Sequence, residues 1–132
     1  MKVLVDTSAW SLALRRQDGR RHPASSKLSA LIEQGQDICI TGCILQEVLQ
    51  GFRSDAQFRK VRSLLEHVPL LSLERSDHVA AAMLRRRCAS SGIAGTTIDC
   101  QTAAAAIEHD CILLTADRDF EHISKVSPLR LL

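Results

Sequence analysis

The sequence has few aromatic residues and no cysteine pattern of a disulfide or zinc site. One tryptophan, three phenylalanines and no tyrosine occur among 132 residues, so side chains on which single-stranded bases can stack are scarce. Five cysteines are scattered along the chain without a CxxC pair or a histidine cluster at zinc spacing. An odd, scattered set is typical of buried thiols in a reducing compartment. The composition therefore argues against a disulfide-stabilised or zinc-binding protein.

Long hydrophobic runs and a strong net charge are also absent. The chain begins MKVLVD, where only three consecutive apolar residues precede Asp6, so we expect no signal peptide. No apolar stretch approaches the roughly 20 residues that span a bilayer. The formal net charge of +2 does not by itself indicate a nucleic-acid partner. We expect a cytoplasmic protein without membrane association, folded as one domain over residues 1–132.

Short apolar segments alternate with helical patterns along the whole chain. Strands are predicted at residues 2–5, 37–40, 68–73, 111–115 and 129–132. Helices are predicted at 7–15, from a cap at Ser25 or Ser26 to 33, from a cap at Thr41 to about 51, and at 55–67, 76–90, 97–108 and 118–124, the helix at 97–108 capped by Thr97. This alternation predicts an α/β fold, a three-layer α/β/α sandwich around a central parallel sheet.

Acidic residues lie near the junctions between these strands and helices. Asp6 follows the first strand, Glu47 lies in the helix after the second, and Asp99 lies in the first turn of a later helix. Asp117 and Asp119 follow the strand at 111–115. Each alone is explained as readily by helix capping or by a solvated helix face. Because the carboxyl ends of parallel strands meet at one edge of a sheet, we expect these carboxylates to converge.

Converging carboxylates need a compensating charge. Two of them about 5 Å apart repel by roughly 3 kcal/mol at an effective dielectric of ~20, against a domain stability of roughly 5–15 kcal/mol. No lysine or arginine lies within three residues of Glu47 or between residues 96 and 107. A bound cation is the simplest compensation, and all-oxygen ligands favour Mg²⁺ or Mn²⁺. The acids therefore predict a metal-dependent enzyme that hydrolyses phosphodiesters.

Hydroxyl and basic side chains accompany the acids. Hydroxyls that could bond a carboxylate or a metal-bound water belong to Thr7, Ser8, Thr97 and Thr115, although capping explains Thr97 equally well. Arginines that could flank the acidic edge and bind the phosphates of a polyanion are Arg15, Arg16, Arg20 and Arg21. Solvated surface explains the arginines as readily. With so few aromatics, RNA would be recognised by its shape and backbone.

Four motifs occur in the order found in PIN-domain ribonucleases. They are DTSAW at 6–10, ILQEVLQG at 44–51, TTIDCQTAAAAIEHD at 96–110 and LLTADRDF at 113–120. The chain resembles the VapC-type toxins of bacterial toxin–antitoxin pairs over about its whole length.

The resemblance has consequences for the site and for the partners. It implies that Asp6, Glu47 and Asp99 are the core metal ligands and that Asp117 is the fourth acid, with Asp119 in a less defined part. It also implies a PIN-like fold, Mg²⁺ or Mn²⁺ dependence, RNA cleavage, a homodimer and neutralisation by a cognate VapB-type antitoxin. The amphipathic helices at 25–33 and 55–67 could offer apolar strips to such partners.

Three other functions are compatible with parts of the pattern. A haloacid-dehalogenase-like phosphatase would use Asp6 as a covalent nucleophile, but the second acid of its D-x-D motif is Ser8 here. A receiver-like signalling domain would need a phospho-acceptor aspartate after a central strand, which we do not find. A non-catalytic module of the same fold that binds RNA or an antitoxin stays open. Metal-dependent RNA cleavage would separate the nuclease from that module.

Overall fold

A parallel sheet of four strands lies at the centre of the molecule. The computed structural model describes residues 1–15 and 22–132. The strands are β1 (Lys2–Val5), β2 (Asp37–Thr41), β3 (Leu70–Leu71) and β4 (Cys111–Leu114), in the order β3-β2-β1-β4. Leu4 of β1 pairs in parallel with Cys39 of β2 and with Leu113 of β4. The carboxyl ends of β1 and β4 therefore lie side by side at one edge of the sheet.

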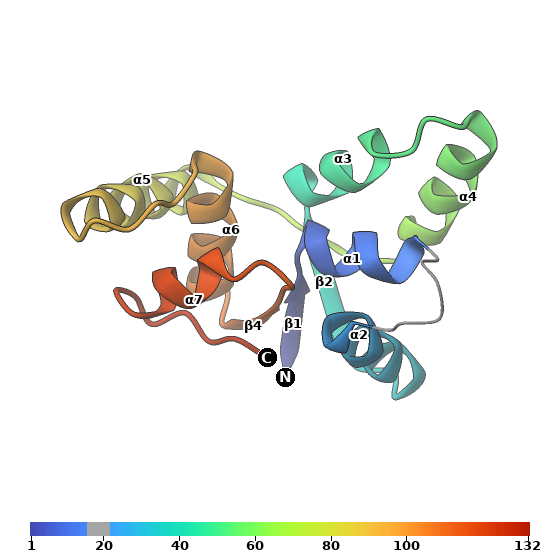
Figure 1. Ribbon diagram of the computed structural model, residues 1–132, viewed down its shortest axis with the longest axis horizontal. Helices are drawn as coiled ribbons and strands as arrows, with labels where there is room; N and C mark the ends of the chain where they lie inside the picture. The colour runs from blue at the N-terminus through green and yellow to red at the C-terminus, as the bar shows by residue number, and fades with distance from the viewer. Residues whose placement is uncertain (16–21) are drawn as a thin grey trace.

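Helices cover the sheet from both sides. They are α1 (Thr7–Leu14), α2 (Pro23–Glu33), α3 (Gly42–Gln50), α4 (Asp55–Leu65), α5 (Arg75–Ser90), α6 (Thr97–Glu108) and α7 (Asp119–Ser124). Figure 1 shows α1 to α4 on one side of β1 and α5 to α7 on the other. The predicted three-layer α/β/α sandwich around a parallel sheet is confirmed. No helix in the described part of the chain is long and apolar enough to cross a membrane.

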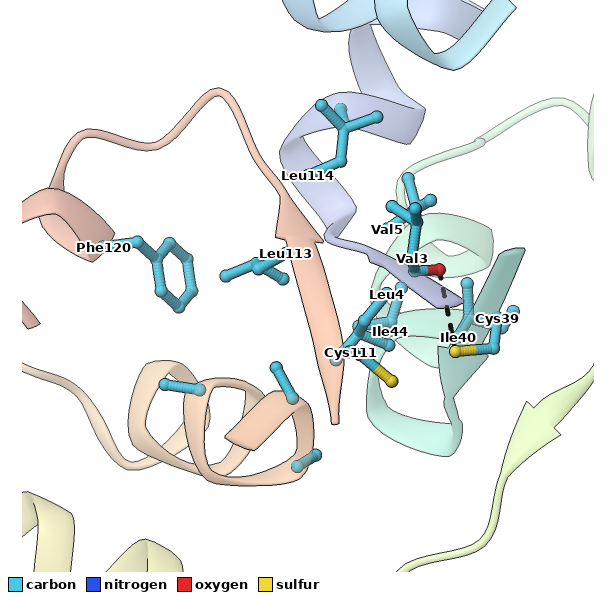
Figure 2. Close-up of a cluster of buried hydrophobic side chains, with 14 of the residues drawn as sticks. Val3, Leu4, Val5, Cys39, Ile40, Ile44, Cys111, Leu113, Leu114 and Phe120 are labelled. Carbon is cyan, nitrogen blue, oxygen red and sulfur yellow. Dashed lines mark hydrogen bonds between the residues drawn. The ribbon is translucent and has the colours of Figure 1, made fainter. Parts of the chain in front are cut away.

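The core is built on the central strands and on an alanine-rich helix. Val3, Leu4 and Val5 are fully buried. The four consecutive alanines 103–106 of α6 are each at most 2% exposed. These small side chains let α6 pack closely against β4. Figure 2 shows apolar side chains from β1, β2, β4 and α7 gathered around the sheet. This packing fixes the positions of the loops that follow β1 and β4.

The cysteines are thiols, as the sequence predicts, and four of the five are buried. Cys39 is 2% exposed, and its Sγ donates to the carbonyl oxygen of Val3 (Figure 2). Burial, with the adjacent Cys111 thiol, raises the pKa of Cys39 to about 12. A thiol with so high a pKa stays protonated at neutral pH and is a poor nucleophile. Cys39 is thus a core residue.

Two predicted strands are shorter than the sequence suggests. The strand predicted at 68–73 is reduced to Leu70–Leu71, because Pro69 has no N–H to donate and serves only as an acceptor for Ile40 N. The strand predicted at 129–132 is a single parallel bridge between Leu131 and Leu113. Both segments lie at the edges of the sheet, where they form few ladder hydrogen bonds.

Helix starts also differ from the prediction. The second helix begins at Pro23, before the predicted caps Ser25 and Ser26, because His22 Nδ1 accepts from Ala24 N at 3.1 Å. Proline suits the first helical position since its missing N–H would be unpaired there anyway. Within α4, the apolar spacing of residues 58, 61, 64 and 65 predicts that Leu64 points inward, but Leu64 is 45% exposed. The helix itself ends at Leu65, two residues earlier than predicted.

Candidate metal centre at the carboxyl edge of the sheet

Asp6 lies where β1 ends and α1 begins. Its backbone N–H donates to the carbonyl oxygen of Leu114 at 2.9 Å, which continues the pairing of β1 with β4. Asp6 occupies the N-cap position of α1, but its side chain makes no capping hydrogen bond. The carboxylate, in a residue only 8% exposed, accepts at Oδ2 from Ser8 Oγ and Thr115 Oγ1, both at 2.9 Å. Its Oδ1 accepts from none of the described residues.

Ser8 and Thr115 join the loop after β1 to the loop after β4. Ser8 Oγ accepts from the backbone N–H of Ala116 at 2.9 Å, and Thr115 Oγ1 accepts from that of Asp117 at 3.0 Å. Each hydroxyl has a single proton. When both protons are donated to Asp6 Oδ2, the 3.1 Å contact between the two hydroxyl oxygens is a packing contact. The two hydroxyls therefore fix the Asp6 carboxylate relative to the Asp117 turn.

Three carboxylates converge beside this network. Asp99, Asp117 and Asp119 each offer one oxygen, and these three atoms lie within 4.8 Å of one another. Asp99 and Asp117 are half-buried and Asp119 is exposed. Asp117 Oδ1 accepts from the backbone N–H of Asp119 at 2.9 Å, which holds the turn into α7. Segments eighteen to twenty residues apart thus bring oxygen ligands to one point.

A capping box holds Asp99 in the first turn of α6. Thr96 Oγ1 accepts from Asp99 N at 3.1 Å, and Asp99 Oδ2 accepts from Thr96 N at 3.4 Å. Burial is the main cause that raises the pKa of Asp99, and the negative charges of Asp117 and Asp6 raise it further. The bonds to Thr96 act in the opposite direction. The pKa of Asp99 is therefore affected both by Asp6, which follows β1, and by Asp117, which follows β4.

Glu47 reaches the same edge from α3. Its Oε1 accepts from Thr7 Oγ1 at 2.9 Å, which connects it to the residue that follows Asp6. Neither Glu47 nor Asp6 belongs to the trio of Asp99, Asp117 and Asp119 within the described part of the chain. The structure thus brings three of the five predicted acids together as a close trio. Asp6 and Glu47 lie outside that trio, and Thr7, the residue after Asp6, bonds Glu47.

Thr97, predicted to bond a carboxylate or to cap the helix, does neither among the described residues. Thr97 is exposed and makes no side-chain hydrogen bond to a described residue, because Thr96 takes the capping role predicted for it. The pattern T-x-x-D from 96 to 99 could have identified Thr96.

Of the four predicted arginines, only Arg15 lies within the described residues. Arg15 Nη2 donates to Gly51 O at 3.0 Å, and its guanidinium lies 5.7 Å from the centre of the Phe52 ring. Because Arg15 follows the C-terminal end of α1 and Asp6 precedes its start, the two are separated by the helix length. Arg16, Arg20 and Arg21 lie outside the described residues.

The donor set suits a hard divalent cation. Among the described residues, basic and acidic side chains pair as Arg62–Glu66, Arg130–Asp110 and, when the histidine is protonated, His109–Asp77; none of these pairs includes an acid of the site. No cationic side chain of the described residues therefore forms an ion pair with the acids at the sheet edge. Carboxylate oxygens at this separation are ligands that Mg²⁺, Mn²⁺ and Ca²⁺ prefer over softer metals. The residues present fit such an ion.

Comparison with known proteins assigns the chain to a family. A model of the PIN domain family matches residues 3–126. The chain belongs to the PIN domain family. The resemblance predicted from the four sequence motifs is thus confirmed.

Individual relatives carry related names. "Ribonuclease VapC11" of Mycobacterium tuberculosis and "VapC ribonuclease Mb1587" of Mycobacterium bovis are each 29% identical to the chain over 130 residues. These alignments cover 97% of this chain and 96% of each relative.

Solved structures share the PIN fold. A DNA-bound VapBC from Salmonella typhimurium superposes with a TM-score of 0.80 at 17% identity, over 100% of this chain and 97% of that one. FitAcB from Neisseria gonorrhoeae gives 0.76 at 20% identity, over 98% and 96%. At these identities the structural likeness establishes the fold of this chain. The names VapBC and FitAcB belong to the solved proteins and are not assigned to this chain.

Proposed function

We propose that this chain is a metal-dependent endoribonuclease and the toxin of a type II toxin–antitoxin pair. The observation that carries the proposal is the trio of oxygens from Asp99, Asp117 and Asp119, within 4.8 Å of one another at the edge of a PIN-domain sheet. The names of the full-length relatives, which are ribonucleases of the VapC kind, support RNA as the substrate. The whole of residues 1–132 would act as one nuclease domain.

The site residues divide into ligands and supports. Asp6, Glu47, Asp99 and Asp117 would hold Mg²⁺ or Mn²⁺, with Asp119 beside Asp117. The cation would polarise a phosphodiester oxygen and lower the pKa of a water, offsetting charge that develops at phosphorus. Ser8 and Thr115 would keep Oδ2 of Asp6 occupied, so that Oδ1 faces the ion. Thr7 would orient Glu47 in the same way.

The expected partners follow from the relatives. Structures with the same fold were solved as VapBC and as FitAB, which supports a cognate VapB-type antitoxin for this chain. We also propose a homodimer, RNA as the nucleic acid cleaved, and a cytoplasmic location.

The first test removes charge from the site without changing its shape. We predict that Asp99→Asn and Asp6→Asn each lower Mg²⁺- or Mn²⁺-dependent RNA cleavage at least a hundredfold. Asparagine keeps one oxygen acceptor but loses the charge that a divalent cation needs. The measurement is cleavage of a labelled RNA with titrated metal. Asp55→Asn, at an exposed position in the first turn of α4, is the matched control and should keep full activity.

Full activity of Asp99→Asn would refute the metal role, and inertness of the wild type with every metal would favour the non-catalytic module. A second experiment tests the biological role. The chain is expressed alone and then with the product of an adjacent small gene, and RNA 5′ ends are sequenced. Growth arrest with discrete new ends, reversed by the neighbour, is the expected result. Normal growth with unchanged RNA ends would contradict the toxin assignment.

A further inference from the structure

A cavity adjoins the acidic trio. It has a volume of about 320 Å³ and lies between the start of α2, the turn from β4 into α7, and the segment around Leu131. Asp117 lines this cavity and also belongs to the trio. We call it the flanking pocket. The flanking pocket and the trio therefore share one residue and lie next to each other.

The flanking pocket carries donors for an anion. Lys27 and Arg118 line it, both are exposed, and neither forms an ion pair with a described residue. Lys27 Nζ donates to Leu132 O at 3.2 Å, which leaves two ammonium protons for another acceptor. Arg118 offers a planar guanidinium that suits phosphate oxygens. Two cationic side chains thus stand beside a site otherwise dominated by carboxylates.

His22 adds a third donor to the same lining. Its Nδ1 accepts from the backbone N–H of Ala24 at 3.1 Å. In the neutral ring the proton must then be on Nε2, which becomes a donor. His22 is exposed and lines the flanking pocket. Its ring can therefore donate to a phosphate or to a ribose oxygen without losing its capping bond.

The remaining lining suits the rest of a nucleotide. Pro23, Ala116 and Leu131 give apolar surface against which a sugar or base can pack, and Glu121 gives an acceptor for a hydroxyl or amino group. The flanking pocket thus combines phosphate donors, an apolar wall and an acceptor within a volume suited to one nucleotide.

We propose that the flanking pocket binds the nucleotide next to the scissile phosphodiester of a single-stranded RNA. Lys27 and Arg118 would contact its phosphate. This inference rests on the proposed function, since it takes the acidic trio as the place of cleavage. Phosphate contacts fix the register of a strand without reading its sequence. The pocket would therefore set which bond of the strand lies over the trio.

The test uses the full chain with Lys27→Met and Arg118→Gln combined. Its matched control combines Lys125→Met and Arg86→Gln, which removes the same charge at exposed positions outside the pocket. Affinity for a fluorescein-labelled single-stranded RNA is measured by anisotropy in an Asp99→Asn background, so that binding is scored without cleavage. The pocket variant should bind about tenfold or more weakly and lose about one unit of salt slope per phosphate contact. The control variant should change RNA affinity and salt slope by less than half of the changes seen in the pocket variant.

Three further outcomes decide the proposal. Lys27→Arg with Arg118→Lys should restore affinity, since the charges return, and thermal unfolding should show that each variant is folded. An RNA affinity and salt slope equal to those of the control would overturn the proposal. Loss of affinity for a partner protein with unchanged RNA affinity would also overturn it and make the pocket a protein site.

Measuring RNA binding and RNA cleavage separately allows the proposed function and the proposed subsite to be refuted independently. A wild-type protein that binds RNA through the pocket but never cleaves it would refute the proposed function and keep the subsite. Intact cleavage with a pocket variant of unchanged KM would refute the subsite and keep the nuclease.

Discussion

At the scale of the residue, hydroxyl groups decide how the carboxylates are presented. Thr7 stands next to Asp6 in the chain but bonds Glu47, forty positions away. Ser8 and Thr115, which are 107 positions apart, share the same oxygen of Asp6. Because the sequence places hydroxyl residues next to acidic ones, it predicts that some hydroxyls will donate hydrogen bonds to carboxylates. Which hydroxyl serves which acid depends on rotamers and on the approach of distant loops, and no local pattern specifies these.

Ser8 joins both sides of this network, since its Oγ donates to Asp6 Oδ2 and accepts from the backbone N–H of Ala116. We predict that Ser8→Ala lowers the free energy of unfolding by about 1–2 kcal/mol, because the backbone N–H of Ala116 loses its acceptor. The same change should lower RNA cleavage, since Asp6 loses one of its two hydroxyl donors. Urea unfolding and initial cleavage rates are the measurements. Ser11→Ala in the same helix is the control, and equal stability of the two variants would contradict the prediction.

At the scale of the element, a hydrogen bond between Asp77 of α5 and His109 at the end of α6 ties the two helices together. Asp77 is 6% exposed and accepts from Glu74 N at 2.8 Å and from His109 Nε2 at 3.0 Å. The bond from the Glu74 backbone is the main cause that lowers the pKa of Asp77, and the bond from His109 lowers it further, against burial. A lowered pKa in the folded state stabilises the fold above the ordinary pKa of the group. That stability is lost as the pH falls through the lowered value.

Asp77→Ala tests this link. We predict a loss of about 2 kcal/mol in the free energy of unfolding at pH 7, since both a cap and a buried bond disappear. The difference from the wild type should shrink at acid pH, where Asp77 is protonated in both states. Urea unfolding from pH 7 to pH 3 measures it. Glu33→Ala, at the exposed end of α2, should show no such trend, and a constant difference for Asp77→Ala would contradict the linkage.

The loop before α6 is fitted to two cysteines. A Cβ at Gly95 would lie 3.1 Å from Cys100 Sγ and 3.6 Å from Cys88 Sγ. We predict that Gly95→Ala lowers stability by about 1 kcal/mol or more through overpacking between α5 and α6. In a Cys100→Ala background the same substitution should cost less, because the sulfur is gone. Gly42→Ala, where nothing lies within 4 Å, is the control. Equal costs in both backgrounds would exclude the sulfur contact as the cause.

At the scale of the whole molecule, the acidic edge is expected to make stability depend on metal. Burial and neighbouring acids raise the pKa of Asp99. Its ionised form is therefore disfavoured by folding, and the metal-free protein loses stability as the pH rises from the ordinary pKa through the raised one. A cation that binds only the folded state offsets this loss. At one hundred times its dissociation constant it contributes about 2.7 kcal/mol.

The corresponding experiment follows the single tryptophan, Trp10, which is 2% exposed in α1. We predict that Mg²⁺ or Mn²⁺ raises the wild-type unfolding temperature at pH 7. Asp99→Asn should be more stable than the wild type without metal and should respond weakly to it. Asp55→Asn should respond like the wild type. An identical response of Asp99→Asn and the wild type would contradict a metal site at Asp99.

The sequence by itself determined the fold class, most helix and strand positions, and the order of the acids. Hydrophobic periodicity and strand–helix alternation are local properties, and they fix which residues must be buried. Two caps were assigned wrongly: Thr96 lies one position before the predicted Thr97, which has the same side chain, and His22 lies three positions before the predicted Ser25. The convergence of the acids was predicted, but tertiary structure alone decided that Asp99, Asp117 and Asp119 form the close trio without Asp6 and Glu47. It alone also decided that Thr7 bonds Glu47 and that Lys27 and Arg118 line one cavity. These contacts join segments far apart in the chain, so they exist only once the parallel sheet has brought its carboxyl ends together.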